Sequence, residues 1–444
     1  MQVLKILLCQ SYLGQKSGEP RVFPLGLSYL ASLIKDEHEL YCYDPNVAQD
    51  PLRELSALIN KINPDVVGLS LRNIDSSFSY AIRSYYPSFV SQLKVIRENA
   101  PSCKLVVGGT GFSLFAEEIM KRNSEIDMGI MFEGEVPFAE LLKNFDNPER
   151  IKNLIFRKNG KLVFTGKREW IDPDCLPFPS RELFEMKEYL KYPFSIGVSS
   201  NRGCGMNCIY CPVKFIMGGF FRLRSPKKVV DEIQLLNTNF GVNDFFFTDE
   251  LFCCTLDHAR AICKEIIKRK LDIRWRAEFN PAYLNLLLME ESVKAGCDLF
   301  NFSLDGASNN SLNFLGKNFD VNSIKKTINL TRQVDGANIG FSFLYDLPKH
   351  NAEHTLGLVS LIPKAQFVLG RKLRYVSLSR MRIYPYTSLC KKALEEGKIS
   401  ENTDLLNPTY YTSNSLSNPS NFFPNILRYS SFLFDKISRP QCHN

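Results

Sequence analysis

The feature that most constrains the fold is a regular alternation of short apolar segments with segments of helical periodicity. In the first 150 residues, the apolar runs Val3 to Cys9, Asp65 to Leu71 and Lys104 to Val107 are separated by segments whose apolar residues recur every three or four positions. Strands that alternate with helices pair in parallel, and the helices cover both faces of the sheet. The first part of the chain is therefore predicted to be an α/β domain with a doubly wound, Rossmann-like parallel sheet.

A second strand–helix series begins at Phe194. It contains six apolar segments, at residues 194–199, 244–248, 273–279, 299–304, 339–345 and 375–383. Six parallel strands with intervening helices predict a partial, open (β/α)6 barrel, whose chemistry lies in the loops at the carboxyl ends of the strands.

Turn and linker signals divide the chain. A hairpin over residues 154–165 turns at Asn159-Gly160, and a proline-rich stretch follows at residues 172–179. The predicted domains are residues 1–150 for the first sheet, 151–192 for hairpin and linker, and 193–400 for the barrel. Residues 401–444 are rich in Asn, Ser, Pro and Tyr, and their aromatic content predicts a tail that packs near the barrel.

Composition narrows the class of protein. The chain has 444 residues, 44% hydrophobic and 23% charged, with a net charge of +8. These values describe a soluble globular protein, and the 13 cysteines, an odd number, favour a reducing cytoplasm over a disulfide scaffold. No apolar run reaches the roughly 20 residues of a membrane span. The most basic stretch, read as a solvated or phosphate-facing patch with nucleic-acid binding as the weaker alternative, contains Arg222, Arg224, Lys227 and Lys228.

Three cysteines, Cys204, Cys208 and Cys211, stand at the spacing C-x3-C-x2-C. Thiolates at this spacing can hold three irons of one cubane cluster, which leaves the fourth iron open for a substrate or cosubstrate. Zinc is the competing interpretation, although zinc usually takes paired C-x2-C units, and ordinary thiols are a third. The sequence favours a [4Fe–4S] cluster with these three metal ligands.

With an aromatic residue before its last cysteine, the triplet resembles the signature of the radical SAM family, in which S-adenosylmethionine (SAM) chelates the open iron. The resemblance places Asp249 and Glu250 near the methionyl amino group, and Arg276 and Glu278 near the carboxylate and ribose. The SAM contacts that it implies are Tyr210, Asp249, Glu250, Arg276, Glu278 and Ser303.

The first domain resembles the cobalamin-binding domain that precedes the barrel in one large radical SAM class. Glycines at its predicted strand ends would let the backbone approach a bulky nucleotide tail. A flavodoxin-like domain that binds nothing is the alternative. The cobalamin contacts that the resemblance implies are Leu71, Arg72, Asn73, Gly108, Gly109, Glu133, Gly134 and Glu135.

One departure from many cobalamin proteins is the absence of an Asp-x-His-x-x-Gly run, and His38 is the only histidine in the first half. We therefore expect base-off cobalamin with no protein histidine on cobalt. Arg72 lies where the resembling tryptophan C2-methyltransferases carry an arginine below the corrin. A cation there would disfavour water on cobalt; alternatively, Arg72 pairs with Asp75 or with a corrin amide.

The resemblance implies a cobalamin-dependent radical SAM methyltransferase. Such an enzyme would move a methyl group from SAM, via methylcobalamin, to a carbon of a small-molecule or natural-product substrate, and would need an external electron donor of the flavodoxin or ferredoxin type. One alternative is a related enzyme with non-methylating radical chemistry, such as cyclisation or ring contraction. Another is an iron–sulfur or corrinoid carrier, but a carrier would not need a barrel with acidic strand ends. Nucleic acid is not an expected partner.

Overall fold

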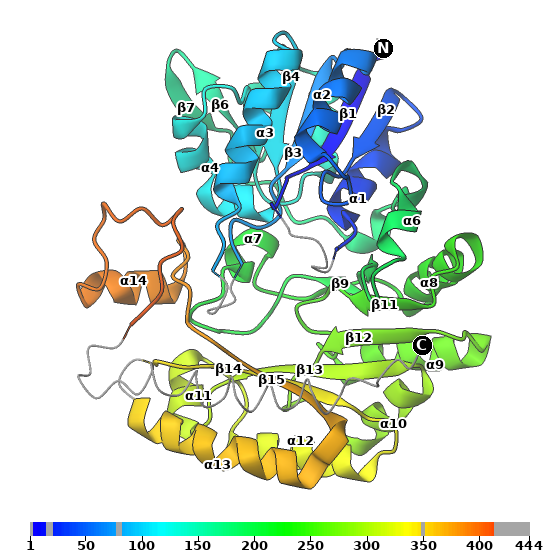
Figure 1. Cartoon of the computed structure of the whole chain (residues 1–444), viewed down its shortest axis with the longest axis vertical. Coiled ribbons are helices and arrows are strands. Elements are labelled where there is room, and N and C mark those ends of the chain that lie inside the picture. The colour runs from blue at the N-terminus through cyan, green and yellow to red at the C-terminus, as the bar shows by residue number, and fades with distance from the viewer. Residues whose placement is uncertain (1–2, 15–20, 77–81, 348–350, 413–444) are drawn as a thin grey trace.

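The computed structural model describes residues 3–14, 21–76, 82–347 and 351–412, and it contains two α/β sheets stacked end to end (Figure 1). The first sheet has seven strands and the second has six. The cysteine segment and helix α7 (Val213–Met217) lie between the two sheets (Figure 1). Both predicted fold classes are confirmed.

The first sheet has the strand order β2-β1-β3-β4-β5-β6-β7. Its first five strands are parallel, and the chain reverses its direction of winding between β1 and β3. In doubly wound sheets, ligands bind beyond the carboxyl ends of the strands near such a point. The strand bounds are β1 Lys5–Gln10, β2 Glu39–Tyr43, β3 Val66–Ser70, β4 Lys104–Gly108, β5 Met128–Ile130, β6 Leu154–Lys158 and β7 Lys161–Phe164.

Both faces of this sheet are buried. In β1, Ile6 and Leu8 pack in one hydrophobic cluster, while Leu7 and Cys9 pack in another on the opposite face. Alternate residues of a strand point to opposite faces, so a strand covered by helices on both sides is apolar throughout. The helices are α1 Leu25–Ile34, α2 Pro51–Ile62, α3 Tyr86–Asn99, α4 Thr110–Arg122 and α5 Glu135–Lys143.

The hairpin differs from its predicted place in the linker. Strand β6 pairs antiparallel with β5, with Ile130 opposite Leu154, so that the hairpin extends the first sheet. Without it, β5 would present a free edge of unpaired backbone groups. Leu154 and Phe156 also complete the buried face of the sheet.

A short linker joins the two domains tightly. It includes α6 (Met186–Tyr189), and the Tyr189 ring contacts Phe23 at a centroid distance of 5.1 Å. The Tyr189 hydroxyl donates to Asp44 Oδ2 over 2.6 Å. One hydrophobic cluster continues from the first sheet through Tyr189 into the barrel, so the two domains share a core.

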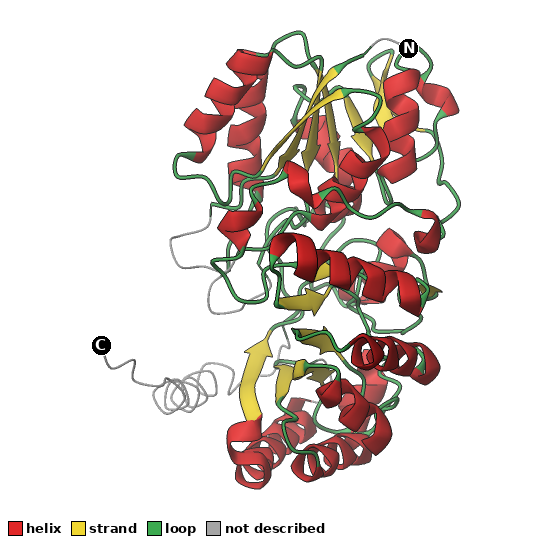
Figure 2. Cartoon of the chain, turned by 90° about the vertical axis from the view of Figure 1, so that its right-hand side faces the viewer, coloured by secondary structure: helices red, strands yellow, loops and turns green. Residues whose placement is uncertain are grey.

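The second sheet has the strand order β15-β14-β13-β12-β11-β8, all parallel. Strand β8 is shorter than the predicted segment, and the barrel is open because β8 and β15 are the two ends of this order. Figure 2 shows the helices of this domain packed on one side of the sheet. The strand bounds are β8 Gly197–Val198, β11 Asp244–Phe247, β12 Arg274–Glu278, β13 Cys297–Asp305, β14 Ile339–Leu344 and β15 Leu373–Ser379.

The helices of the barrel begin at local sequence signals. Side chains of Thr255, Asn285 and Ser308 accept hydrogen bonds from the first turns of α9, α10 and α11, as expected of N-caps. The outer face of the sheet, which these helices cover, is strongly aromatic and includes Trp275 and Phe300. The helix bounds are α8 Pro226–Phe240, α9 Leu256–Arg269, α10 Leu286–Lys294, α11 Asn309–Leu315, α12 Val321–Gln333, α13 Asn351–Leu369 and α14 Ser388–Glu395.

The start of the predicted tail returns to the barrel. Tyr411 packs in a small cluster with Met381 and Ile383, and Tyr410 forms an isolated bridge with Arg382. Residues 413–444 lie outside the described part of the chain. Across the described ranges, no helix has the length and apolar character to cross a membrane.

Candidate functional site

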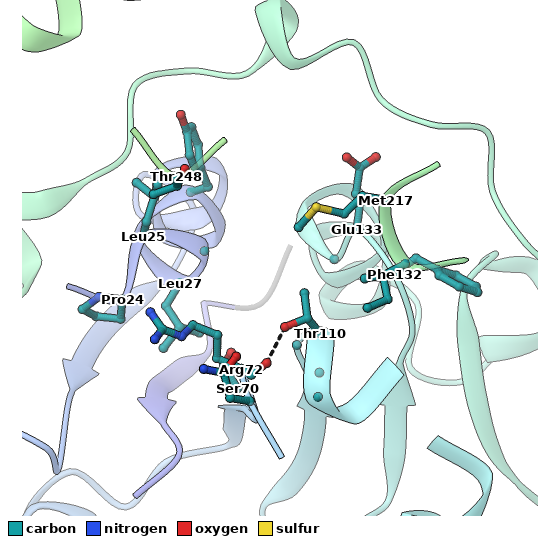
Figure 3. A pocket seen from close by; sticks show the side chains of 18 of the residues that line it. Pro24, Leu25, Leu27, Ser70, Arg72, Thr110, Phe132, Glu133, Met217 and Thr248 are labelled. Atoms are coloured by element: carbon teal, nitrogen blue, oxygen red, sulfur yellow. Dashed lines mark hydrogen bonds between the residues drawn. The ribbon is translucent and has the colours of Figure 1, made fainter. Parts of the chain in front are cut away.

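A cavity of about 680 Å³ lies where the carboxyl ends of the first sheet face the cysteine segment. Figure 3 shows side chains from both domains around it. Its lining includes Gly203 and Pro212, which bracket the cysteine triplet. The cavity size is typical of cofactor sites. The predicted site residues that line it are Arg72, Asn73, Gly108, Gly109, Glu133, Gly134, Glu135, Asp249 and Glu250.

The floor of the cavity is formed by the loops after β3 and β4, pressed together. Gly109 has φ of 102°, and a Cβ there would approach the Leu71 carbonyl oxygen to 2.5 Å. The Gly111 amide donates to the carbonyls of Leu71 and Arg72 over 3.0 and 2.8 Å. Only glycine allows this approach. The Leu71 side chain itself is fully buried below the floor, so of the predicted cobalamin contacts it is the one that does not line the cavity.

Arg72 is the cation of this floor. In Figure 3 its side chain extends toward Pro24 and Leu27 at the start of α1. Burial lowers the pKa of Arg72, and the charge of Asp44 opposes that effect. Asp75 instead pairs with Arg382, Nε to Oδ2 at 2.9 Å, so the alternative pairing of Arg72 with Asp75 is not found. Among the described residues, the Arg72 guanidinium has no hydrogen-bond or ion-pair partner.

The Glu133-Gly134-Glu135 loop after β5 links the two domains. Arg202, in β9 (Asn201–Arg202), contacts Glu133 over 3.1 Å and Glu135 over 2.6 Å. Arg222, in β10 (Arg222–Leu223), contacts Glu133 over 2.8 Å. Burial alone would raise the pKa of Glu135, but Arg202 more than offsets it and the pKa is lowered. Both carboxylates are thus held by arginines next to the cysteine segment.

The expected basic patch is largely internal. Arg222 pairs with Glu133, and Arg224 pairs with Glu232 over 2.8 Å, with both partners of that second pair almost fully buried. The interpretation of Arg222 and Arg224 as solvated residues was therefore wrong. Both arginines point inward from the β9–β10 ribbon, while Leu223 between them is exposed, and this alternation accounts for the sequence pattern.

The cysteine segment is shaped by close backbone contacts. Gly203 has φ of 80°, and a Cβ there would meet the Phe220 carbonyl oxygen at 2.3 Å. The Cys204 amide donates to the Gly218 carbonyl over 3.2 Å. The half-buried thiols of Cys204, Cys208 and Cys211 are close enough for their charges to interact. The segment thus gathers the three thiols beside the cavity.

The donor set fits a cluster better than a single ion. Within the described ranges, no three Cys, His, Asp or Glu side chains converge as ligands of one metal ion. Tetrahedral zinc requires such convergence, whereas a cubane takes each thiolate on a different iron. Cys253 and Cys263 are fully buried elsewhere in the barrel core.

A buried cation, which the sequence analysis missed, lies beside the thiols. Lys317 Nζ contacts the Asp305 carboxylate and donates to the Tyr210 hydroxyl over 3.0 Å and to the Ser303 carbonyl over 2.9 Å. Tyr210 also donates to Asp305. The charges of Cys208 and Cys211 interact with Lys317 and, with Asp305, raise its pKa against the effect of burial. Lys317 can therefore balance negative charge at the cluster.

Asp249 and Glu250, the predicted acidic pair, differ in their surroundings. The Asp249 carboxylate accepts from the amides of Ser200 and Asn201 over 2.8 and 3.1 Å, and so holds the backbone that leads to the cysteines. Burial raises the pKa of Asp249 to about 6. Glu250 lines the cavity and is exposed to solvent there. Burial and the charge of Asp249 raise the pKa of Glu250 to about 7.

The remaining predicted SAM contacts lie on the inner face of the barrel. Glu278 accepts from Ser303 Oγ over 3.3 Å. Burial, with added repulsion from Glu250, raises the pKa of Glu278 to about 7. Arg276 is already engaged, because it donates to Asp298 over 2.9 and 3.0 Å and lies 3.6 Å over the Phe194 ring. The structure thus brings Glu250 and Glu278 together and leaves Arg276 apart with its own partner.

Comparison with known families defines the class of protein. Residues 17–142 match the B12 binding domain family, and residues 198–362 match the Radical SAM superfamily. The chain therefore combines a B12-binding domain with a radical SAM domain, as the two predicted cofactor sites require. These matches confirm the expected class and its cofactors, cobalamin, SAM and a [4Fe–4S] cluster.

Individual proteins are similar over most of the chain. An uncharacterized methyltransferase of Pyrococcus horikoshii is 26% identical over 89% of this chain and 84% of its own length. The anaerobic magnesium-protoporphyrin IX monomethyl ester cyclase of Cereibacter sphaeroides is 26% identical over 70% of this chain, which spans about half (52%) of the cyclase.

Among solved structures, the fold resembles the radical SAM methyltransferase TsrM from Kitasatospora setae. The TM-score is 0.76 at 19% identity, and the match with the tryptophan-bound and SAM-analog-bound form covers 94% of this chain and 82% of TsrM. A second TsrM structure, with cobalamin and a [4Fe–4S] cluster, also has a TM-score of 0.76.

Proposed function

We propose that this protein is a cobalamin-dependent radical SAM methyltransferase that methylates a carbon of a small-molecule substrate. The observation that carries the proposal is a shared cavity in which the strand ends of the B12-binding domain face the segment that bears the cysteine triplet. When bound, cobalamin supplies a transferable methyl group, and SAM on the cluster supplies both methyl and radical chemistry. The names of the relatives and the fold of TsrM support the same activity.

On the cobalamin side, the chain provides a floor without a nitrogen ligand. No histidine lies among the described residues that line the cavity. His38 is buried elsewhere, where its Nδ1 accepts from the Leu4 amide over 3.4 Å. The guanidinium of Arg72, which forms no ion pair with another described residue, is the charged group of the floor, and it keeps its planar shape. These residues fit cobalamin held base-off.

On the SAM side, carboxylates and a cation both lie near the cysteine triplet, and Glu278 and Lys317 each hydrogen-bond Ser303. Glu250 and Glu278 supply negative charge for an ammonium group. Lys317 supplies positive charge close to the thiols. Tyr210 and Asp305 fix the Lys317 side chain, so that its charge stays in place. The chain therefore positions charges of both signs before any cofactor binds.

The expected partners follow from this chemistry. Reduction of a cluster requires an external one-electron donor of the flavodoxin or ferredoxin type, and cytoplasmic surroundings would supply it. The pairing of Arg222 and Arg224 with buried glutamates supports the view that nucleic acid is not a partner.

Non-methylating radical chemistry is the second candidate, and the similarity to the magnesium-protoporphyrin cyclase favours it. An iron–sulfur or corrinoid carrier is a third, because the same residues would hold cofactors without catalysis.

One experiment separates the three. The protein is reconstituted with cobalamin and cluster, reduced and incubated with SAM. Methyl transfer from SAM to cobalamin releases S-adenosylhomocysteine, and reductive cleavage releases 5′-deoxyadenosine. The methyltransferase predicts S-adenosylhomocysteine. The alternative enzyme predicts only 5′-deoxyadenosine, and a carrier predicts neither.

A further inference from the structure

Lys317 is held beside the cysteine triplet by main-chain contacts. It directly follows the C-cap of α11, Gly316, which has φ of 74°. A Cβ at Gly316 would meet the Asn207 carbonyl oxygen at 2.2 Å, and the Ile209 amide donates to the Leu315 carbonyl over 3.1 Å. Asn207 and Ile209 flank the second cysteine, so the chain just before Lys317 packs against the middle of the triplet.

The Lys317 ammonium is buried together with its acid. The Lys317 side chain is 7% exposed and that of Asp305 is 8% exposed. Asp305 ends β13 with φ of 61°, and the pairing of β13 with β14 shifts its register between Ser303 and Asp305. A non-glycine residue keeps a positive φ only where its surroundings fix it. Asp305, Tyr210 and the Ser303 carbonyl therefore hold the ammonium in one place.

The charge of Lys317 acts on the thiols of the triplet. Burial would lower the pKa of Lys317, but Asp305 and then Cys208 and Cys211 raise it. The Glu250 carboxylate acts on Cys211 with the opposite sign. Lys317 is thus a buried cation whose field reaches the triplet, and inside the protein this field is weakly screened by water and salt.

Such a cation affects the reduction of a cluster more than its assembly. Reduction places one electron, and therefore one negative charge, on the iron–sulfur core. The reduction potential depends on the net charge and the hydrogen bonds around the cluster. A buried cation stabilises the more negative, reduced form, whereas a buried carboxylate opposes it.

We propose that the buried Lys317–Asp305 pair sets the reduction potential of the cluster, with Lys317 raising it and Asp305 limiting the rise. The electron comes from the external one-electron donor and stays on the iron–sulfur core, so no bond of the chain forms or breaks. This inference rests on the proposed function, which requires a cluster on the triplet and its reduction. It assigns a role to two residues that lie outside the cysteine motif.

The test compares Asp305→Asn with the double variant Asp305→Asn/Lys317→Gln. Each full chain is reconstituted with the cluster and titrated with dithionite in the absence of SAM, and electron paramagnetic resonance gives the fraction of reduced cluster at each potential. The two proteins differ only at residue 317, and neither leaves Asp305 as a buried carboxylate without its cation, which would be costly.

The double variant should be harder to reduce. At a fixed potential, its ratio of reduced to oxidised cluster should be at least about tenfold lower than that of Asp305→Asn, a shift of about 59 mV for one electron. Asp305→Asn itself should be easier to reduce than the wild type, because it keeps the cation and loses the opposing carboxylate.

The matched control is Lys214→Gln. The charge of Lys214 also acts on a thiol of the triplet, that of Cys204, but its side chain is exposed and contacts Asn207. Water and salt screen an exposed charge, so Lys214→Gln should shift the potential less than the loss of Lys317 does, and less still at high salt. A shift as large as that caused by the loss of Lys317 would overturn the proposal.

Two further readouts keep the outcomes distinct. Thermal unfolding of each apoprotein and the absorbance of the reconstituted cluster show whether a variant is folded and loaded. If the double variant is not, Asp305→Asn against the wild type still tests the sign, and a lower potential in Asp305→Asn would overturn the proposal. Equal potentials in Asp305→Asn and the double variant would refute only the role of Lys317, whereas a wild-type protein that assembles no cluster would refute the proposed function.

Discussion

Arg202 Nη2 lies 2.6 Å from Glu135 Oε1, and this contact joins the strand that precedes the cysteine triplet to the loop after β5 of the cobalamin domain. The same guanidinium contacts Glu133, and it lies 5.4 Å over the Tyr29 ring. Only Gly203 separates Arg202 from Cys204, so this side chain ties the cysteine segment to the first domain.

Arg202→Gln is expected to lower the free energy of unfolding by about 3 kcal/mol, because it leaves two buried carboxylates with one fewer cation. Urea unfolding of the apoprotein measures this. The matched control is Arg168→Gln, since Arg168 pairs with Glu140 over 2.9 Å at a more exposed position. Its loss should cost at most about 1 kcal/mol. Equal losses of unfolding free energy in the two variants would show that the ion pairs of Arg202 contribute no more than an exposed pair.

Replacing Cys204, Cys208 and Cys211 with Ala should remove the absorbance near roughly 400 nm of the reconstituted protein, because a cubane with thiolate ligands absorbs there. Corrinoid binding should remain. Cys263→Ala is the control, as that thiol is buried in the barrel core. If Cys253, Cys254 or Cys263 were equally necessary for this band, the ligand assignment would be wrong.

Arg72→Ala should retain cobalamin but let water reach the lower face, which slows methyl transfer. Arg72→Lys should restore activity only partly, because a compact ammonium lacks the planar fork of a guanidinium. Activity and the cob(II)alamin resonance spectrum are the two measurements. Nitrogen hyperfine splitting in the wild-type spectrum would contradict base-off binding, and a fully active Arg72→Ala with an unchanged spectrum would make Arg72 structural.

Glu278→Gln should change stability in a pH-dependent way. The pKa of Glu278 is raised to about 7 in the folded protein from 4.5, so the folded state holds its proton more tightly than the unfolded state. The stability that this proton contributes is complete below pH 4.5 and is lost as the pH rises through 7. Glu278→Gln should therefore match the wild type near pH 4.5 and exceed it by about 1–3 kcal/mol at pH 8.

Urea unfolding at both pH values measures this difference. Glu149→Gln is the control, because Lys158 pairs with Glu149 and lowers its pKa at a fully exposed site. A Glu278→Gln variant that gains no stability between the two pH values would show that Glu278 titrates normally.

The sequence predicts features that depend on local periodicity. The alternation of strands and helices, the cysteine spacing and the glycines at strand ends can all be recognised from neighbouring residues. Gly109 is one of these glycines, and in the structure its backbone packs closely against the Leu71 carbonyl. The sequence predicted the hairpin itself but not its partner. The hairpin pairs with β5 because β5 is the edge strand of the assembled parallel sheet, and that edge is not visible in the local sequence.

Side-chain partners could not be predicted in the same way. Lys317 follows a short helix with no motif around it, and it reaches the thiols because Gly316 packs against the Asn207 carbonyl. Asp75 and Arg382 are 307 residues apart, so nothing in either segment indicates the other. Each of these charged side chains has several oppositely charged residues in the sequence as possible partners, and only the tertiary fold determines which one it contacts.

The Asp75–Arg382 and Glu135–Arg202 pairs are placed at the ends of β3 and β5, on either side of β4, and each joins the two domains. Separating the domains at either pair would part buried charges, which costs several kcal/mol. We therefore expect assembly and loading to be coupled, with cobalamin bound more readily by a chain that is still folding than by one in which both pairs have formed.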